Sequence, residues 1–402
     1  MGWLRALRWP DFRRVWFVGS LMQFGYWFAS ISFQWLVARA TDNDPLALSV
    51  LYFCVLAPML LFSLPAGALA DIRDRRRIIA VAQAGVIAVS LITGALALFD
   101  AAPAVVVMVC GFVAGTMHTM AVPANHALVA VAVPSEDLRH GILMQSAGIN
   151  LARIAGPPAA SLIILLFGVA NSLFAYGVIG LATLLTTLGV RTASTPGGGS
   201  TEDGLLVRIR SGFDHVRTHP PAGAALTIVA IASIFGLSYS AQLPALAARV
   251  SPDPSAFLAL ASVASVGSFA GVILAGLPRS AAPSVSPAAA MLGLQAAVVA
   301  GLAFAREFWV VMALLVLGGV LQFGIMTSCN AVLQAVVDDE HRGRVSSLYI
   351  LCWGGLLPVG GLLLGVLWRL FGATPALVSC AAVVLAVAVA LLAPRSPRTR
   401  PA

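Results

Sequence analysis

The sequence predicts an all-α membrane protein with twelve transmembrane helices, and three observations support this class. Of the 402 residues, 59% are hydrophobic and only 10% are charged, and the mean hydropathy is +0.94. A soluble globular domain carries roughly 25% charged residues. Apolar runs long enough to cross a bilayer recur along the chain, and the basic residues fall between them. A chain of this composition needs lipid as its solvent.

The predicted spans follow from length and hydropathy. Crossing the hydrocarbon layer takes about 20 apolar residues in a helix. The shortest break between two spans is 168–171, where Gly-Val-Ala-Asn must form a very tight turn. The predicted spans are 15–38, 46–70, 78–98, 103–126, 141–167, 170–189, 222–246, 256–277, 286–305, 308–335, 345–368 and 372–393.

The distribution of arginine predicts the orientation in the membrane. The formal net charge is +8, and every basic residue among the 24 is arginine. With the N-terminus in the cytoplasm, 19 of them fall in cytoplasmic segments, four in external segments and Arg153 within a span. Cytoplasmic loops carry the positive excess, so both termini are expected in the cytoplasm, with the protein in a bacterial plasma membrane. Arginines dispersed in short loops do not indicate a nucleic-acid partner.

The longest loop, 190–221, lies at the middle of the chain. Residues 195–204 are rich in Gly, Ser and Thr, which is typical of a flexible linker. The loop predicts three parts: an N-terminal six-helix bundle (1–189), an interdomain loop (190–221) and a C-terminal six-helix bundle (222–402). Apolar residues then recur at helical spacing with arginines between them, which predicts an amphipathic helix on the inner membrane surface: Leu205, Ile209, Phe213 and Val216.

An internal repeat supports this division. Residues 125–131 (NHALVAV) match residues 330–336 (NAVLQAV), and further along Pro157 pairs with Pro358. An ordered series of matches indicates that the two halves are structurally equivalent. Two six-helix halves related by a parallel repeat are the architecture of major facilitator transporters.

The most specific motif follows the second span, at residues 67–77 (GALADIRDRRR). It resembles the cytoplasmic loop motif of the major facilitator superfamily, G-x-L-x-D-R-x-G-R-R, with Ile72 and Asp74 in place of a basic residue and a glycine. The resemblance implies a latch that holds the two halves together in the outward-open state. An arginine cluster that only sets topology is the alternative. The matching residues are Gly67, Leu69, Asp71, Arg75 and Arg76.

Further stretches resemble the branch of this family that contains enterobactin exporters and macrolide efflux pumps. They include residues 57–60 (APML), 150–157 (NLARIAGP) and 342–345 (RGRV), and the resemblance covers nearly the whole chain. It implies export of a small amphiphilic molecule, siderophore-, antibiotic- or drug-like, by proton antiport.

The sequence departs from the family pattern in two places. The loop after the eighth span, 276–283, has no acidic residue equivalent to Asp71. The antiporter motif of the fifth span is partial: Arg153, Gly156 and Pro157 are present in the antiporter-like segment, but its final glycines are replaced by small residues. Small residues still permit close helix packing.

Uncharged polar residues predict a weakly polar cavity. In the first span, Gln23, Trp27, Ser30 and Gln34 follow helical spacing and therefore share one face. Polar groups in lipid need partners, so this face points toward a cavity or a neighbouring helix. Substrate contact and helix–helix contact are both open for each residue. The other candidates for the cavity are Gln145, Asn150, Tyr239, Gln242, Gln322 and Asn330.

Charged side chains inside the spans are rare. All 16 acidic residues fall in loops or at helix ends, although proton-coupled transporters commonly use an embedded carboxylate. His118 is a candidate for proton coupling, because a histidine changes charge near neutral pH; a packing histidine is the alternative. Arg153 needs a partner, and three are open: backbone carbonyls and amides such as Asn150 or Gln145, an acidic group of the substrate, or a group that alternates in protonation.

The leading hypothesis is a secondary active exporter that works by alternating access. An importer or facilitator on the same fold and a non-transporting membrane sensor are the alternatives. The sequence has no nucleotide-binding loop, metal-ligand cluster or Ser/His/Asp set, so an enzyme, a metal site and ATP-driven transport are not expected. We expect a monomer in the lipid bilayer that takes a small-molecule substrate, with a proton gradient and no cofactor.

Overall fold

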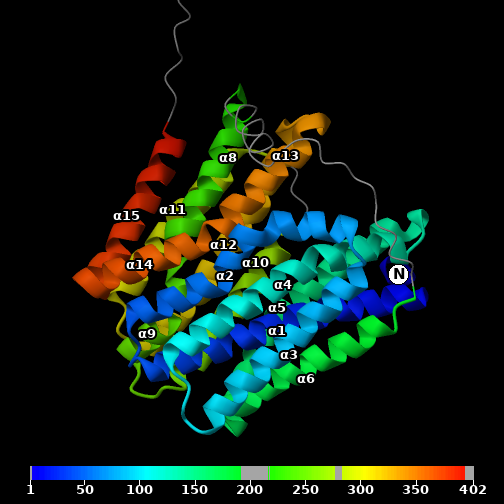
Figure 1. The fold of residues 1–402 in the computed structure, drawn as a ribbon. Coiled ribbons are helices and arrows are strands. Elements are labelled where there is room, and N and C mark those ends of the chain that lie inside the picture. The colour runs from blue at the N-terminus through cyan, green and yellow to red at the C-terminus, as the bar shows by residue number, and fades with distance from the viewer. Residues whose placement is uncertain (1, 192–215, 217, 277–282, 394–402) are drawn as a thin grey trace, which may run out of the picture.

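The computed structural model describes residues 2–191, 216, 218–276 and 283–393, and helices account for nearly all of them (Figure 1). The amphipathic helix predicted with Leu205, Ile209 and Phe213 lies outside the described residues, as does most of the loop that follows the eighth predicted span.

Six long helices precede residue 190, and each overlaps one predicted span. Two short 3-10 helices, η1 (Gly2–Arg8) and η2 (Ser135–Asp137), lie before the first and the fifth of them. The long helices are α1 (Pro10–Ala40), α2 (Pro45–Ile72), α3 (Arg75–Leu98), α4 (Ala104–Ala132), α5 (Leu138–Phe167) and α6 (Val169–Leu188).

After the central loop, the seventh and eleventh predicted spans are interrupted. π-Helical turns break both of them, and such turns often mark functional positions. A proline is the second residue of the helix after each break, in the first turn, where its missing N–H costs least. Neither break was predicted from the sequence. The segments are α8 (Pro220–Ile231), η3 (Ala232–Gly236), η4 (Ser238–Gln242), α9 (Leu243–Val250), then α13 (Asp339–Ile350), η5 (Leu351–Gly355) and α14 (Leu357–Phe371).

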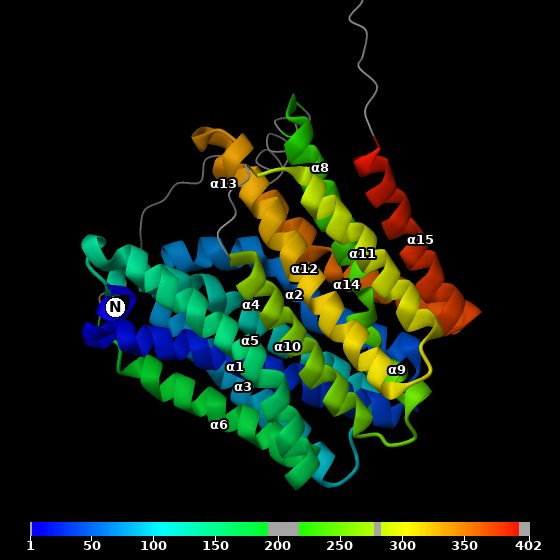
Figure 2. The ribbon, with the colours of Figure 1, turned by 180° about the vertical axis from the view of Figure 1, so that it is seen from behind.

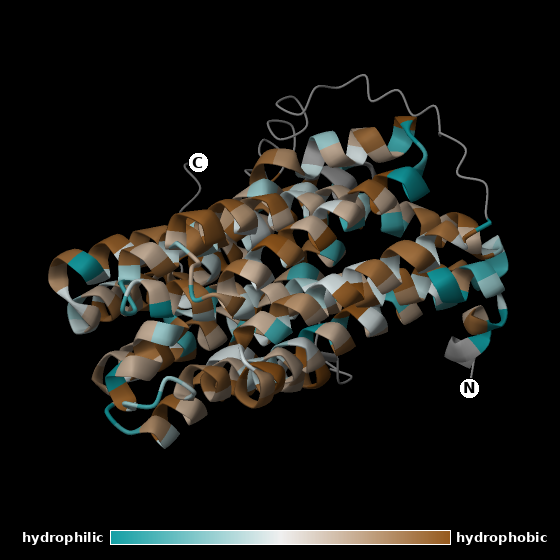
Figure 3. Ribbon diagram, turned by 60° about the horizontal axis from the view of Figure 1, so that its bottom comes forward, coloured by the Kyte–Doolittle hydropathy of each residue, from teal (hydrophilic) through white to brown (hydrophobic). Residues whose placement is uncertain are grey.

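The remaining predicted spans are single helices: α10 (Ala256–Gly276), α11 (Val285–Phe304), α12 (Phe308–Val336) and α15 (Ala373–Leu392). In the described chain, 11 helical segments are long and apolar enough to cross a membrane. Helix α1 is not among them, because Gln23, Gln34 and several serines lower its mean hydropathy. Apolar residues dominate the long helices, and polar ones gather at their ends (Figure 3). The prediction of an all-helical, multi-span membrane protein is confirmed.

The helices pack in two groups that use the same pairings. In the first group, α1–α6, helix α2 lies along α4 and α3 lies along α6. In the second group, α8–α15, helix α10 lies along α12 and α11 lies along α15. Figures 1 and 2 show the two groups from opposite sides. Two helix pairs, α2 with α14 and α5 with α10, make the most extensive contacts between the groups. The same helix pairings therefore occur in both groups.

Two glycines mark equivalent turns in the two groups. Gly168 alone separates α5 from α6, and Gly372 alone separates α14 from α15. Their φ angles are 85° and 87°, a conformation that favours glycine because it has no Cβ. The tight turn predicted at 168–171 is therefore shorter still, since α6 already begins at Val169.

Candidate functional site

The two helix groups are joined by buried hydrogen bonds at the end of the molecule where α2 begins. The amide Nε2 of Gln242 donates to the carbonyl of Pro45 at 2.8 Å and to Ser49 Oγ at 2.6 Å. The Ser49 hydroxyl in turn donates to the carbonyl of Gly361 at 2.7 Å. Gln242 and Ser49 are both fully buried. We call Pro45, Ser49, Gln242 and Gly361 the gate cluster.

Close backbone approach supports the gate cluster. A Cβ added to Gly361 of α14 would collide with the Tyr52 ring of α2, and one added to Gly365 would collide with Ser49. The Gly-x-x-x-Gly spacing therefore lets α14 lie directly against α2. This spacing is visible in the sequence and was not used in the sequence analysis.

Other contacts between the groups lie at the same end. They are the ion pair of Arg369 Nη1 with Asp44 Oδ2 at 3.4 Å, the stacked rings of Trp35 and Phe257 with centroids 6.3 Å apart, and the Ser161 hydroxyl donating to the Leu258 carbonyl at 3.1 Å. The ion pair is solvent-exposed and is worth about 0–1 kcal/mol, so it contributes less than the buried hydrogen bonds.

The predicted latch residues lie at the opposite end of α2. Arg75 donates from Nε to the carbonyl of Ala70 at 3.1 Å and from Nη1 to the carbonyl of Ala127 at 3.5 Å. Arg76 donates from Nη1 to the carbonyl of Val190 at 3.0 Å. These contacts hold α2, α3, α4 and the end of α6 together within the first group.

Asp74, which replaces the usual glycine of the motif, caps helix α3. Its carboxylate accepts from the backbone N–H of Arg76 at 3.0 Å and pairs with the Arg76 guanidinium at 3.3 Å. Partial burial acts to raise the pKa of Asp74. The hydrogen bonds and charge of Arg76, with the charge of Arg77, outweigh that effect, so the pKa lies below its ordinary value.

The other motif residues leave the surface near them open. A Cβ on Gly67 would meet nothing within 4 Å, and Asp71 makes no hydrogen bond or ion pair with a described residue. Leu69 packs on the apolar core of the first group. Between residues whose side chains the structure describes, no hydrogen bond or ion pair joins the two groups at this end.

On α1, the predicted polar face meets α5 rather than open space. Trp27 packs against Gly156, where a Cβ would overlap the Trp27 side chain. Its Nε1–H is buried and has no acceptor among the described residues. Gln34 is buried and its Nε2 donates to Ser30 Oγ at 3.5 Å, while Gln23 is partly buried.

Two candidates on α5 have protein partners. Gln145 Nε2 donates to Asn125 Oδ1 at 3.2 Å, and Asn125 donates to the carbonyl of Val15 at 3.1 Å. This chain of bonds ties α5 to α4 and α1. Asn150 donates to the carbonyl of Ser146 in its own helix. For Gln145, these contacts favour helix–helix contact over substrate contact.

The candidates in the second group are dispersed. Tyr239 is 2% exposed, and Gln322 is fully buried without a partner for either amide atom among the described residues. Asn330 is exposed on α12. For all ten residues proposed for the cavity, contact with a substrate stays a prediction.

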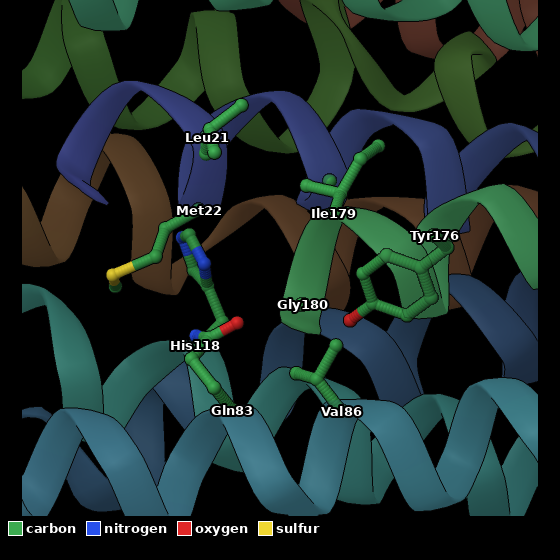
Figure 4. Close-up of a pocket in the computed structure, with 9 residues that line it drawn as sticks. Leu21, Met22, Gln83, Val86, His118, Tyr176, Ile179 and Gly180 are labelled. Carbon is green, nitrogen blue, oxygen red and sulfur yellow. The ribbon is translucent and has the colours of Figure 1, made fainter. Parts of the chain in front are cut away.

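His118 lies inside the first group. Its ring stacks on Tyr26, with centroids 4.4 Å apart and planes at 26°. It borders a small enclosed cavity of about 10 Å³, room for about one water molecule, and Figure 4 shows Tyr176 and Gln83 on the wall of the same cavity. A role in proton coupling would need a path from this cavity to the surface, so it stays a prediction.

Arg153 lies between the two groups. Its guanidinium carbon is 4.9 Å from the ring centroid of Phe323 on α12. An arginine at the centre of a span costs about 2.5–3.5 kcal/mol on insertion scales, whereas a cation–π contact returns about 0.5–2 kcal/mol. Neither Asn150 nor Gln145 supplies the expected hydrogen bond, since both bond elsewhere. Phe323 gave no sequence signal, because its side chain carries no polar group.

Comparison with known proteins identifies the family. The model of the transmembrane secretion effector family matches residues 2–401. The chain belongs to this family, a branch of the major facilitator superfamily. It is similar to the staphyloferrin A transporter of Staphylococcus aureus, with 23% identity over 89% of this chain and 90% of that protein. The resemblance stated from the sequence is confirmed, and the protein is a membrane transporter of this family.

Solved structures share the fold at low sequence identity. The nucleoside transporter NupG matches with a TM-score of 0.78 and 10% identity, covering 95% of this chain and 99% of that one. A bacterial homologue of the human lysosomal transporter Spinster, solved inward-facing and unoccupied, matches with a TM-score of 0.60 and 18% identity, covering 95% and 94%. These likenesses show the fold alone.

Proposed function

We propose that this protein exports a small amphiphilic organic molecule by alternating access, driven by proton antiport. In this proposal α1 is a further membrane span, which makes twelve, and residues 1–189 and 222–402 are two six-helix bundles linked by 190–221. The protein works as a monomer in the bacterial plasma membrane, with both termini in the cytoplasm. The membrane is its lipid partner, and no cofactor takes part.

The gate cluster is the observation that carries the proposal. The buried bonds of Gln242 and Ser49 join the bundles at one end, and no hydrogen bond or ion pair between described side chains joins them at the other. With the arginine-rich loop in the cytoplasm, the closed end faces outward and the conformation is inward-facing. Alternating access requires a second conformation that closes the other end, and the motif at 67–77 lies at that end.

The open surface at Gly67 and Asp71 supports a latch in the second conformation. Gly67 leaves room for another helix to come into contact with α2, and Asp71 is an acceptor without a described partner. Closure of the cytoplasmic end would bring the second bundle against both residues. The bonds of Arg75 and Arg76 within the first bundle would keep this loop in place through the motion.

The relative that transports staphyloferrin A supports a siderophore-like substrate, although the identity is only 23%. Export rather than import rests on the resemblance to exporters and on the family description as a secretion effector. An importer on the same fold would reverse the direction, and a sensor would move nothing.

Accumulation measurements test this function. Cells with the protein should accumulate less of an exported siderophore than cells without it, and a protonophore should abolish the difference. Higher accumulation in cells with the protein would indicate import, and equal accumulation for every compound tried would contradict transport. The genes beside this one direct the choice of compounds, since siderophore or antibiotic biosynthesis next to it would name the substrate class.

A further inference from the structure

The surroundings of Arg153 contain hydrogen-bond donors without acceptors. The guanidinium makes no hydrogen bond or ion pair with a described residue. Among the described residues, it makes a cation–π contact with the ring of Phe323. No Asp or Glu of the described helices lies away from a helix end. Arg153 is half-buried. A guanidinium in this position lacks the carboxylate or carbonyls that arginine forks normally bind.

A second donor belongs to Trp27, which packs on α5 one helical turn after Arg153. Trp27 packs against Gly156, three residues after Arg153, and its Nε1–H is buried without a described acceptor. The indole nitrogen can only donate a hydrogen bond, so it is a second donor without an acceptor among the described residues. Two helices of the first bundle, α1 and α5, thus each carry a donor without a described acceptor, and neither has an acidic residue away from its ends.

Aromatic rings of the second bundle lie opposite Arg153. Phe323 of α12 faces Arg153, and its ring meets that of Trp353 edge-on, with centroids 6.3 Å apart. Trp353 lies in the π-helical turn η5, and the next residue, Gly354, contacts Met59 of the first bundle. Arg153, Phe323 and Trp353 are all partly exposed. The place therefore combines a cation on one bundle with aromatic surface on the other.

From this arrangement we propose that Arg153, Phe323, Trp353 and Trp27 form the substrate-binding site, and that it selects an anionic amphiphile. The ligand carries a carboxylate or similar acidic group for Arg153 and Trp27 and an aromatic or other apolar body for Phe323 and Trp353. A cationic amphiphile is rejected, because it would meet an uncompensated arginine. The proposal rests on the proposed transport function and names its substrate class.

Binding to purified protein in detergent tests the selectivity without a gradient. The probes are tritiated naphthoate, its neutral amide and the cationic naphthylmethylamine, which share one ring system. We expect naphthoate to bind about tenfold more tightly than either analogue, the effect of one charge-assisted hydrogen-bonded pair. Arg153→Gln should remove the preference, and Arg153→Lys should restore part of it, since an ammonium cannot form the two parallel bonds. Trp27→Phe should weaken naphthoate binding and leave amine binding unchanged.

Arg249 supplies the matched control. It also faces an aromatic ring, that of Trp368 at 5.8 Å, but it donates to the carbonyl of Ala303 at 3.0 Å and so has an acceptor. Arg249→Gln should keep the preference for naphthoate. Unchanged size-exclusion profiles for all variants separate lost binding from lost folding, and Arg153→Lys tests the site if Arg153→Gln fails to fold.

Two results would overturn the proposal: equal affinity of the wild type for the three probes, or a preference that survives in Arg153→Gln. A transport assay in proteoliposomes distinguishes failure of the binding-site proposal from failure of the proposed transport function. Gradient-driven movement of the amide as fast as of naphthoate overturns anion selection and leaves the transporter in place. Selective binding that depends on Arg153, without movement of any probe, supports the site and contradicts the proposed transport.

Discussion

Ser49 of α2 and Gly365 of α14 lie so close that one methyl group on residue 365 would collide with the Ser49 hydroxyl. The same hydroxyl accepts a hydrogen bond from the Gln242 amide and donates one to the carbonyl of Gly361. Steric fit and hydrogen bonding at the closed end therefore depend on a single small side chain. Changes at these positions should act on the balance between two conformations rather than on folding.

Gly365→Val should open the closed end. The added side chain cannot fit against Ser49 and the backbone of Pro45, so α14 must move away from α2. Spin labels at residues 42 and 371, one on each bundle, should report longer distances by pulsed electron resonance. Gly293→Val is the control, because a Cβ there makes only an ordinary contact with Ala388 at 3.7 Å. Unchanged distances in Gly365→Val would show that this contact does not hold the end closed.

Gln242→Leu should shift the same equilibrium. It removes two buried hydrogen bonds, and each contributes about 0.5–1.5 kcal/mol net, so the ratio of closed to open molecules should change by about 5- to 150-fold. The same labels measure this ratio. Gln242→Leu and Ser49→Ala combined should cost less than the sum of the two changes, since both remove the 2.6 Å bond. Strict additivity would mean that the two side chains act independently.

Asp71→Asn should impair transport while leaving membrane insertion intact. In the proposed outward-open conformation the carboxylate is a latch acceptor, and the amide removes its charge. Asp74→Asn is the matched control three residues later, because Asp74 caps α3 within the first bundle. The measurement is efflux per molecule of inserted protein. Normal efflux by Asp71→Asn would leave the arginine cluster with a topological role only.

Asp74 should not contribute to the pH dependence of transport between pH 5 and 8. Its pKa is held below the ordinary aspartate value of about 3.9. Stability from the ionised cap is present above that ordinary value and is lost only as the pH falls through the lowered pKa. The pH profiles of efflux for the wild type and Asp74→Asn should therefore coincide across this range. A shifted profile would mean that Asp74 takes part in coupling.

Cysteine labelling should confirm the orientation. On a cysteine-free background, Ser251→Cys should react with an impermeant maleimide added to intact cells, because α9 ends at Val250 on the proposed external side. Ser200→Cys, in the central loop, should react only after the membrane is opened. The reverse pattern would place both termini outside.

Hydropathy predicted the helices well because lipid imposes one requirement on every span. It also gave α1 as a span, although the polar residues of α1 leave it outside the 11 apolar segments. The π-helical turns were not predicted, because they give no periodic signal. The gate cluster was not predictable, since Ser49, Gln242 and Gly361 are far apart in sequence and individually ordinary. The sequence showed that Arg153 needed a partner, but an aromatic ring on α12 could not be chosen from among many.

The single-residue links at Gly168 and Gly372 have a mechanical consequence. Because one residue links α5 to α6, and one residue links α14 to α15, the two helices of each pair must move together. Helix α5 carries Arg153 and α14 carries Gly361 and Gly365, so the ligand contact and the closure each sit on a stiff hairpin. Lengthening either link by a few flexible residues would uncouple the arms of the hairpin, leaving a protein that can still bind but no longer transmits the motion.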